Sequence, residues 1–254
     1  MSKGDGPDFA SRIKAHAAVP AAAVVKRFYE AVTVTEEPGG FGVALDQRPL
    51  RTPARAPLML PSRALAEAIA GEWAAQGAQL LAPTMALTRL ANTALDRVAG
   101  REAAVATEIA AYADSDLLCY RADGPQRLVE RQAAAWDPLL TWAQQALGSR
   151  FACVTGLVHH PQPADALEAL GRGLERQGPF RLAALHTITT LTGSAVLALA
   201  LRDGAIAPDA AWAAAHVDED WQIEQWGADA QAEARRAARR REFDCALRLL
   251  DLLD

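Results

Sequence analysis

The pattern that decides the fold changes within residues 41–73, which read FGVALDQRPLRTPARAPLMLPSRALAEAIAGEW. In residues 41–46 apolar residues alternate with small or polar ones. This is typical of a half-buried strand, because successive side chains point to opposite faces of a sheet. Prolines then stand at positions 49, 53, 57 and 61, and a proline cannot donate to a β-ladder, so short edge strands and turns are predicted there. A helix is predicted after Ser62, a candidate N-cap, because apolar residues recur at helical spacing at Leu65, Ile69 and Trp73.

The two patterns continue on either side of this stretch. Residues 24–35 have β-like composition and precede a turn signal at residues 36–40, Glu-Glu-Pro-Gly-Gly. Short extended segments are predicted at residues 116–121 and 151–157. Helices are predicted at 84–98, at 101–113, from Pro125 to Leu147, and from Pro163 onward with breaks at Gly178-Pro179 and Gly204 to Pro208.

These patterns predict an α+β protein, in which a small β-rich N-terminal domain is followed by a larger, mostly α-helical C-terminal domain. The expected boundaries are a flexible N-terminal arm at 1–23, the β-rich domain at 24–61 and the mainly helical domain at 62–254. Leu182 to Leu201 is apolar enough to be tested as a membrane span. It contains His186 and several threonines, so one buried helix at the centre of a bundle is the better interpretation, and no membrane insertion is expected.

Composition excludes some classes of protein. Of 254 residues, 51% are hydrophobic and 22% charged, which argues against disorder, and the net charge of −5 argues against a general polyanion binder. Cys119, Cys153 and Cys245 are far apart in sequence and lack CxxC spacing, so reduced thiols in a cytoplasmic protein are expected. No secretory signal is recognisable at the N-terminus.

Motifs for catalysis or cofactor binding are not found in the sequence. It contains no GxxxxGK[ST], GxGxxG, GxSxG or HExxH pattern, so neither an enzyme nor a bound cofactor or metal is predicted. Asp114-Ser115-Asp116 resembles a metal clamp, but it stands where a helix should end, and bonds to local backbone are expected instead. His159-His160 is interpreted as a surface pair, and His186 and His216 as core or boundary residues.

An arginine-rich helix near the C-terminus allows two interpretations. Its arginines lie opposite an apolar side that includes Phe243 and Leu250, and Glu233 is expected to pair with Arg236 three positions later. A solvated helix face is favoured over a partner-binding patch, and nucleic-acid binding is weaker still because no aromatic residues lie among the arginines. The arginines are Arg235, Arg236, Arg239, Arg240 and Arg241.

The most unusual segment is residues 217–227, VDEDWQIEQWG. At 100° per residue, Trp212, Ile223 and Trp226 share one face with Glu219, whereas Trp221 lies on the opposite face. A polar stripe lies between the faces and consists of Asp218, Gln222, Gln225 and Asp229. An ordinary core helix with solvated acids and a binding surface are both compatible with this pattern.

This helix resembles the signature of the F1-ATPase α-subunit assembly chaperones, called ATP synthase F1 complex assembly factor 2 in mitochondria. The signature combines an acidic segment, an aromatic residue, glutamine and Trp-Gly. Residues 112–121, YADSDLLCYR, resemble the central motif of the same family. The N-terminal region of the family is matched at Lys26 to Tyr29, Val43 to Asp46, Arg48 to Pro53 and Leu60-Pro61, and Pro83 to Thr88 fits between these regions.

The resemblance implies a monomeric, ATP-independent assembly chaperone that binds the F1 ATP synthase α subunit and prevents its aggregation until the β subunit displaces it. The implied location is the cytoplasm, or the matrix for mitochondrial relatives. The critical acid of the family matches Asp218, with Glu219 as the alternative. The predicted partner-binding residues are Asp218, Glu219, Trp221, Gln222, Gln225 and Trp226.

Two other functions remain open from the residues. A metal-dependent enzyme would use the acids at 114–116 or 218–224 and would bind Mg²⁺ or Mn²⁺ tightly. A nucleic-acid-binding regulator would use the arginine-rich helix and would bind in a salt-sensitive way.

Overall fold

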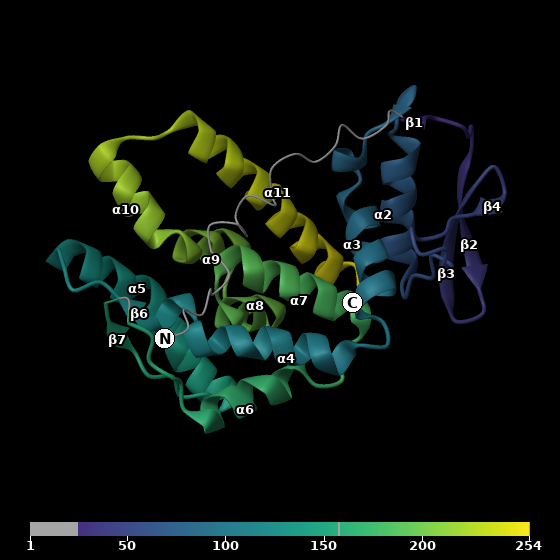
Figure 1. The fold of residues 1–254 in the computed structure, drawn as a ribbon. Helices are drawn as coiled ribbons and strands as arrows, with labels where there is room; N and C mark the ends of the chain where they lie inside the picture. The colour runs from purple at the N-terminus through teal and green to yellow at the C-terminus, as the bar shows by residue number, and fades with distance from the viewer. Residues whose placement is uncertain (1–24, 157, 254) are drawn as a thin grey trace, which may run out of the picture.

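A strand-rich region at the N-terminal side is followed by a body of helices (Figure 1). The computed structural model describes residues 25–156 and 158–253, so the predicted arm at 1–23 lies outside the described residues. The α+β prediction is confirmed. The strands give way to helices at Ser62, whose hydroxyl accepts a hydrogen bond from the backbone N–H of Leu65 and caps α2 (Arg63–Ala74) as predicted.

The strand-rich region is built on one hairpin. Strands β2 (Val32–Glu37) and β3 (Gly40–Leu45) pair antiparallel, with Glu37 opposite Gly40, so the predicted turn at 36–40 is confirmed. The stretch with prolines at every fourth position adds only β4 (Arg48–Pro49) and two isolated bridges. This is expected because a proline has no backbone N–H to donate to a neighbouring strand. Strand β1 (Val25–Lys26) pairs with β5 (Gln79–Leu80). Helix α2 contacts β2 and β3. Val43 of β3, Leu65 and Ile69 of α2, and Leu60 in the connecting segment are buried.

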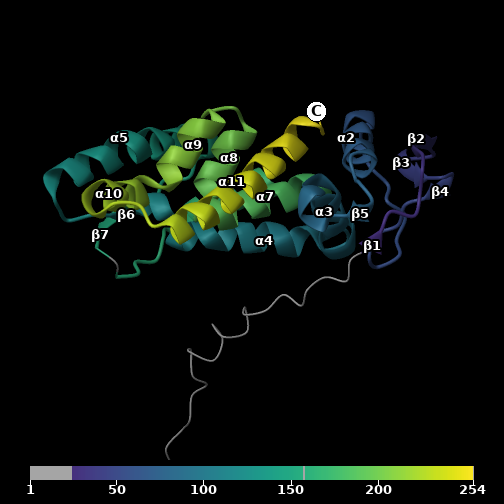
Figure 2. The same ribbon diagram turned by 90° about the horizontal axis from the view of Figure 1, so that it is seen from above.

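The helices pack around α7 (Pro179–Thr192), which contacts α3 (Ala86–Thr93), α4 (Glu102–Tyr112), α8 (Ala195–Arg202) and α11 (Ala230–Asp251). Figure 2 shows α11 running alongside α7. The remaining helices are α5 (Gln126–Trp142), α6 (Ala164–Leu174), α9 (Pro208–Ala215) and α10 (Val217–Trp226). One helical turn each extends α3 and α5, at Ala94–Val98 and Ala143–Leu147, so the helices predicted at 84–98, 101–113 and 125–147 are confirmed.

The prediction of one buried helix from Leu182 to Leu201 is wrong. The segment is buried, but it forms α7 and α8 with a sharp turn between them. Gly193 adopts the left-handed conformation with φ of 71°, and the Ser194 hydroxyl accepts from the N–H of Leu197 to cap α8. Within the part of the chain that the structure describes, no helix has the length and apolar character needed to span a membrane.

Two short parallel strands lie at the end of the helical body that is away from the strand-rich region (Figure 1). Strand β6 (Tyr120–Arg121) pairs with β7 (Val154–Thr155), with Tyr120 opposite Val154. The segment predicted as extended at 116–121 is only partly so, because Leu117–Cys119 forms a 3-10 turn. That turn follows Asp116, whose carboxylate accepts from the N–H of Leu118 and from the N–H of Val196 in α8. Asp116 is fully buried, and its carboxylate oxygens accept hydrogen bonds from backbone N–H groups. Backbone bonding of this acid was predicted from its position at the end of a helix.

Candidate partner-binding site

Helix α10 carries the unusual motif, and it is separate from the helices on either side. His216 has φ −122° and ψ 20°, which ends α9, and Gly227 has φ 86°, which ends α10. The face predicted for Glu219, Ile223 and Trp226 is confirmed within α10, where all three line one groove. The inclusion of Trp212 on that face is wrong, because it required an unbroken helix. Trp212 packs in the core on α9, whereas α10 lies at the end of the molecule opposite the strand-rich region (Figures 1 and 2).

The two tryptophans of α10 have different environments. Val217 is buried and Trp221, one turn later, packs against the hydrophobic core. Trp226 is 83% exposed, the largest exposed fraction among the exposed large hydrophobic side chains of the described residues. Covering an exposed indole with a partner lowers the free energy, because its apolar surface is removed from water. Trp226 is thus available as a binding anchor, whereas Trp221 anchors the helix to its own protein.

Three acids of α10 are held by partners within the chain. Gln132 Nε2 donates to Asp218 Oδ1 at 2.7 Å, and Arg131 Nη1 pairs with Glu224 Oε1 at 2.7 Å; both partners lie on α5. Asp220 forms an ion pair with Arg236 of α11. The helix is therefore connected to two neighbouring helices by polar contacts, which fix its position on the surface.

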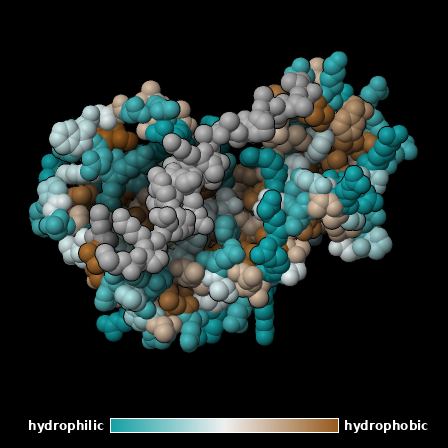
Figure 3. All heavy atoms as spheres, in the orientation of Figure 1, coloured by the Kyte–Doolittle hydropathy of each residue, from teal (hydrophilic) through white to brown (hydrophobic). Residues whose placement is uncertain are grey.

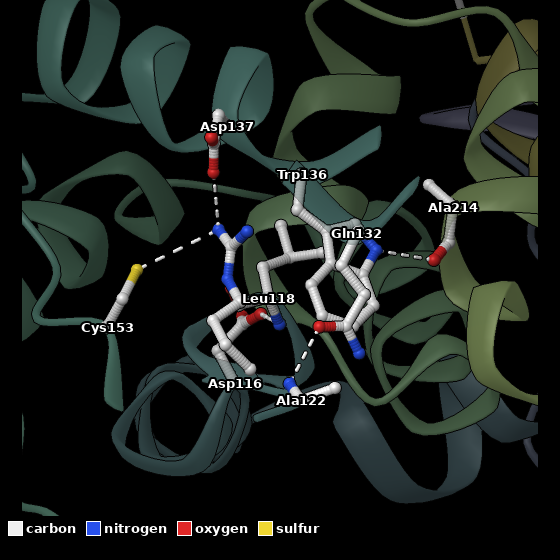
Figure 4. Close-up of polar contacts among 9 residues, drawn as sticks. Asp116, Leu118, Ala122, Gln132, Trp136, Asp137, Cys153 and Ala214 are labelled. Carbon is white, nitrogen blue, oxygen red and sulfur yellow. Dashed lines mark hydrogen bonds and ion pairs between the residues drawn. The ribbon is translucent and has the colours of Figure 1, made fainter. Parts of the chain in front are cut away.

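Gln132 is the central residue of this connection, and Figure 4 shows its contact with Ala122 beside the bond between Trp136 and Ala214. It is buried, and its Oε1 accepts from the backbone N–H of Ala122 at 2.8 Å while its Nε2 donates to Asp218. One turn along α5, the indole of Trp136 donates to the carbonyl of Ala214 at 2.8 Å. Because both ends of the Gln132 amide are used, its orientation is fixed, and it holds Asp218 in place.

Glu219 lies beside a buried histidine. His216 Nδ1 donates to the carbonyl of Trp212 at 2.7 Å, and its Nε2 stands 3.8 Å from Glu219 Oε2 without a hydrogen bond. Burial lowers the pKa of His216, with Arg236 adding to the effect. The ring is therefore neutral at pH 7 and does not neutralise Glu219. The expectation of a core histidine is confirmed, but its Nε2 has no partner among the described residues.

A groove of about 680 Å³ runs between α10 and α11. Ile223, Trp226, Ala232 and Ala237 supply its apolar surface. Its acids are Glu219, Asp220, Asp229 and Glu233, and its basic residues are Arg236 and Arg240. Asp220 neutralises Arg236, and Arg240 is paired with Asp209 and Asp244. Glu219 and Glu233 consequently give the groove an excess of negative charge, which suits a partner with apolar and basic side chains.

The predicted binding residues divide between the groove and the protein itself. Glu219, Gln222 and Trp226 line the groove. Asp218 contacts Gln132, Trp221 packs on the core and Gln225 is exposed outside the groove lining. From the sequence, Ile223 was placed on the shared face and Asp229 in the polar stripe without being selected, and Glu233 was expected to pair with Arg236. The i, i+4 spacing of Asp229 and Glu233 was visible in the sequence, but the break at Gly227 that turns α11 toward α10 was not.

Three of the five arginines of the arginine-rich helix contact other residues of the same chain. Arg236 pairs with Asp220 rather than with Glu233, so the predicted i, i+3 pair is wrong. Arg239 donates to the carbonyl of Leu191, and Arg240 bridges Asp209 and Asp244. These contacts leave little of the run as a continuous basic face, which disfavours the nucleic-acid interpretation. Among residues 25–156 and 158–253, no group of three or more His, Cys, Asp or Glu side chains is placed to hold a metal ion.

Another groove, of about 1050 Å³, lies between α4 and α6. Small residues form much of its lining, including Ala103, Ala106, Ala110 and Gly171, with charged residues such as Glu168 and Arg172 also present. No sequence motif predicted it. It offers a shallow apolar surface without an exposed aromatic side chain in its lining, so the groove beside Trp226 is the stronger candidate for partner binding.

Known proteins resemble the chain over nearly its whole length. A family model described as ATP12 chaperone protein matches residues 26–144. The crystal structure of Atp12 from Paracoccus denitrificans is 42% identical, with a TM-score of 0.86, over 91% of this chain and 99% of that one. The Atu1473 protein of Agrobacterium tumefaciens is 49% identical, with a TM-score of 0.87, over 91% of this chain and 87% of that one. A variant of the P. denitrificans protein with one aspartate replaced by lysine matches equally well, at 41% identity and a TM-score of 0.86, over 91% of this chain and 98% of that one. Identity at this level over such coverage places the chain in the ATP12 chaperone family.

Proposed function

We propose that this chain is an ATP-independent assembly chaperone that binds the α subunit of the F1 ATP synthase and prevents its aggregation until the β subunit displaces it. It acts as a cytoplasmic monomer, without a catalytic site or bound cofactor. The proposal rests on membership of the ATP12 chaperone family and on the resemblance of the α10 motif. The single structural observation that supports it is the exposed indole of Trp226 at the edge of an acidic, partly apolar groove.

The physical basis is the coverage of a surface that would otherwise aggregate. An unassembled subunit exposes apolar area that its neighbour would bury, and such area promotes aggregation. A binder for it needs a central aromatic anchor and a few charges for orientation. Trp226 and Ile223 supply the apolar contact, and Glu219 and Glu233 select basic side chains around it. Release then requires only that the β subunit compete for an overlapping surface, with no hydrolysis of ATP.

The predicted binding set can be refined on this basis. Trp226, Glu219 and Gln222 contact the client directly, and Gln225 contacts it at the edge of the groove. Asp218 and Trp221 act within the chaperone, since they hold α10 against Gln132 and the core.

The test is binding of purified α and β subunits, separately, to the wild type and to Trp226→Ala. We expect selective binding of α and a loss of affinity of about 30-fold in the variant, which corresponds to an anchor worth about 2 kcal/mol. Phe28→Ala is the matched control, because Phe28 is a second highly exposed aromatic side chain and lies between β1 and β2. The strand-rich region stands at the end of the molecule opposite α10 (Figure 1).

Two outcomes would contradict the proposal at different levels. Failure of the wild type to bind α in native or freshly refolded form would refute the chaperone assignment to this client. Binding of α that is weakened by Phe28→Ala but not by Trp226→Ala would retain the client and move the docking surface away from α10.

A further inference from the structure

Two cysteines that are distant in sequence are neighbours in the fold. Cys119 immediately precedes β6 and Cys153 immediately precedes β7, and these strands pair in parallel with Tyr120 opposite Val154. Continuing that register by one residue places Cys119 opposite Cys153. Paired strands lie about 4.8 Å apart, and a disulfide requires Cα atoms about 4.4–6.8 Å apart with both side chains on one side. The ladder therefore presents the two thiols at a separation that a disulfide can bridge.

The two thiols already interact, and they differ in accessibility. The Cys119 thiol donates a hydrogen bond to the Cys153 sulfur. Cys119 is fully buried, whereas Cys153 is exposed. A dissolved reagent can therefore reach Cys153, whereas Cys119 is shielded from it.

A guanidinium group is held against the exposed sulfur (Figure 4). Arg121 Nη2 lies 3.8 Å from Cys153 Sγ and 2.8 Å from Asp137 Oδ1. Its Nε donates to the carbonyl of Leu118 at 3.0 Å, and its guanidinium carbon lies 5.2 Å from the Trp136 ring centroid. Three contacts other than the one with Cys153 fix the cation, so it is in place before any negative charge develops on that sulfur.

This environment lowers the pKa of the Cys153 thiol and raises the pKa of the Cys119 thiol. The hydrogen bond from Cys119 and the charge of Arg121 lower the pKa of Cys153 to about 6. The same hydrogen bond and burial raise the pKa of Cys119. Burial raises the pKa of the third cysteine, Cys245, to about 11. A thiolate is the reactive form of cysteine, so Cys153 combines reactivity with access, and Cys245 has neither to the same degree.

We propose that Cys153 and Cys119 form a reversible redox pair, in which Cys153 is the residue that attacks a hydroperoxide and Cys119 is the residue that resolves the product as a disulfide. In the first step the Cys153 thiolate attacks the terminal oxygen of ROOH, the O–O bond breaks, and ROH leaves after taking up a proton. Cys153 becomes a sulfenic acid. In the second step the Cys119 sulfur attacks the Cys153 sulfur, the S–O bond breaks, and hydroxide leaves with the Cys119 proton as water.

The sum is balanced without any other reactant. Two thiols and one hydroperoxide give one disulfide, one ROH and one water; the two sulfurs lose two electrons, which reduce the O–O bond. A dithiol reagent reverses the reaction by exchange at the exposed Cys153 sulfur. Cys119 and Cys153 enclose 33 residues that lie between them in the sequence, including all of α5, so the disulfide fastens both ends of the segment that carries Gln132 and Trp136.

The test uses the chain of 254 residues, reduced and then treated with hydrogen peroxide at pH 7, followed by peptide mapping without reduction. We expect a linked Cys119–Cys153 peptide that disappears with dithiothreitol. We also expect alkylation of Cys153 by iodoacetamide in the untreated protein at least about tenfold faster than that of Cys245. No linked peptide after oxidation, or alkylation of Cys153 no faster than that of Cys245, would overturn the proposal.

Variants assign the two roles. Cys119→Ala should stop the reaction at the sulfenic acid, detected as a dimedone adduct on Cys153, and Cys245→Ser should form the disulfide as the wild type does. Arg121→Lys keeps the charge but loses the planar group, and it should slow alkylation of Cys153 several-fold. A dimedone adduct on Cys119 in the Cys153→Ser variant would reverse the assigned roles and refute the proposal in this form.

Discussion

At the scale of single residues, Asp218 and Glu219 are adjacent acids with different environments. Asp218 accepts a hydrogen bond from the buried amide of Gln132, whereas Glu219 faces a neutral histidine at the rim of the groove. Removal of Asp218 leaves a buried donor without its acceptor, and a lost partner of that kind costs more than the loss of an exposed charge.

The expected consequence is a difference in stability. Asp218→Ala should lower the free energy of unfolding by about 1–2 kcal/mol relative to Glu219→Ala, measured by urea denaturation of both variants at pH 7. Equal stabilities would show that the Gln132 contact contributes nothing to the fold. The comparison also matters for binding tests, because a charge reversal at Asp218 disturbs the chaperone itself, whereas one at Glu219 changes mainly the groove.

Asp116 gives a prediction for pH. Burial raises the pKa of its carboxyl group from 3.8 to about 6, although the Ser194 hydroxyl and backbone N–H groups of α8 and Leu118 oppose the rise. The folded state therefore binds the proton more tightly than the unfolded state. The stabilisation from this proton is fully present below about pH 4 and is lost as the pH rises through 6.

The measurement compares the wild type with Asp116→Asn, which cannot titrate there. The difference in free energy of unfolding, wild type minus variant, should fall by up to about 3 kcal/mol between pH 3.5 and 7.5. Other carboxyl groups titrate in both proteins and cancel in this difference. A difference that stays level or rises with pH would contradict a raised pKa for Asp116.

At the scale of elements, hydrophobic periodicity predicted the type of structure well and its breaks less well. The strand from Phe41 and the helix after Ser62 followed from alternation and capping. The division of residues 182–201 into α7 and α8 did not, because both helices are buried on several sides and their composition stays apolar through the turn. The breaks at His216 and Gly227 were missed for a related reason, since α9 to α11 continue one polar and aromatic pattern.

Substitutions at two glycines test the turn between α7 and α8 and the exposed surface of α2. Gly193 has φ of 71°, and an added Cβ would meet the Leu117 Cβ at an ordinary 3.8 Å. Gly193→Ala should therefore destabilise the protein by about 1–2 kcal/mol through backbone conformation and not through a clash. Gly71 is exposed within α2 with open space around it, so Gly71→Ala should stabilise by up to about 1 kcal/mol.

Thermal or urea unfolding of the two variants checks both signs. A neutral Gly193→Ala would mean that the turn between α7 and α8 tolerates another conformation. A destabilising Gly71→Ala would mean that the surface of α2 has a contact that the present structure does not contain.

At the scale of the whole molecule, the helical body presents α10 at one end and the strand-rich hairpin at the other (Figure 1). On the face shown in Figure 3, polar and apolar residues are interspersed, so apolar area on that face does not single out one docking surface. The acids and tryptophans of the sequence selected α10, the helix that is proposed here to bind the client. It could not separate residues that face the groove from those that face Gln132 and the core, because that division depends on contacts with α5 and α11, remote in the chain.

The net charge of −5 and the acids of the groove predict how binding responds to salt. Opposite charges accelerate the encounter of two proteins, and salt screens this effect beyond about 8 Å at physiological ionic strength. We expect the association rate with the α subunit to fall as sodium chloride rises. The double variant Glu219→Gln, Glu233→Gln should show a smaller slope. The double variant Glu37→Gln, Glu67→Gln, at two exposed positions outside the groove, removes the same charge and is the control. Stopped-flow kinetics measures the rates, and equal slopes in the three proteins would exclude steering by the groove.

The exposed indole at the end of α10 also makes the protein its own optical probe. Six tryptophans are present, but Trp136 is fully buried and Trp212 nearly so, whereas Trp226 stands in water. Its emission should lie at the red edge of the spectrum and respond most strongly to acrylamide, a neutral quencher that the surrounding carboxylates do not repel as they would iodide. Any molecule that settles on α10 will shift this emission to shorter wavelength and shield it from the quencher, so docking can be followed in solution without attaching a dye.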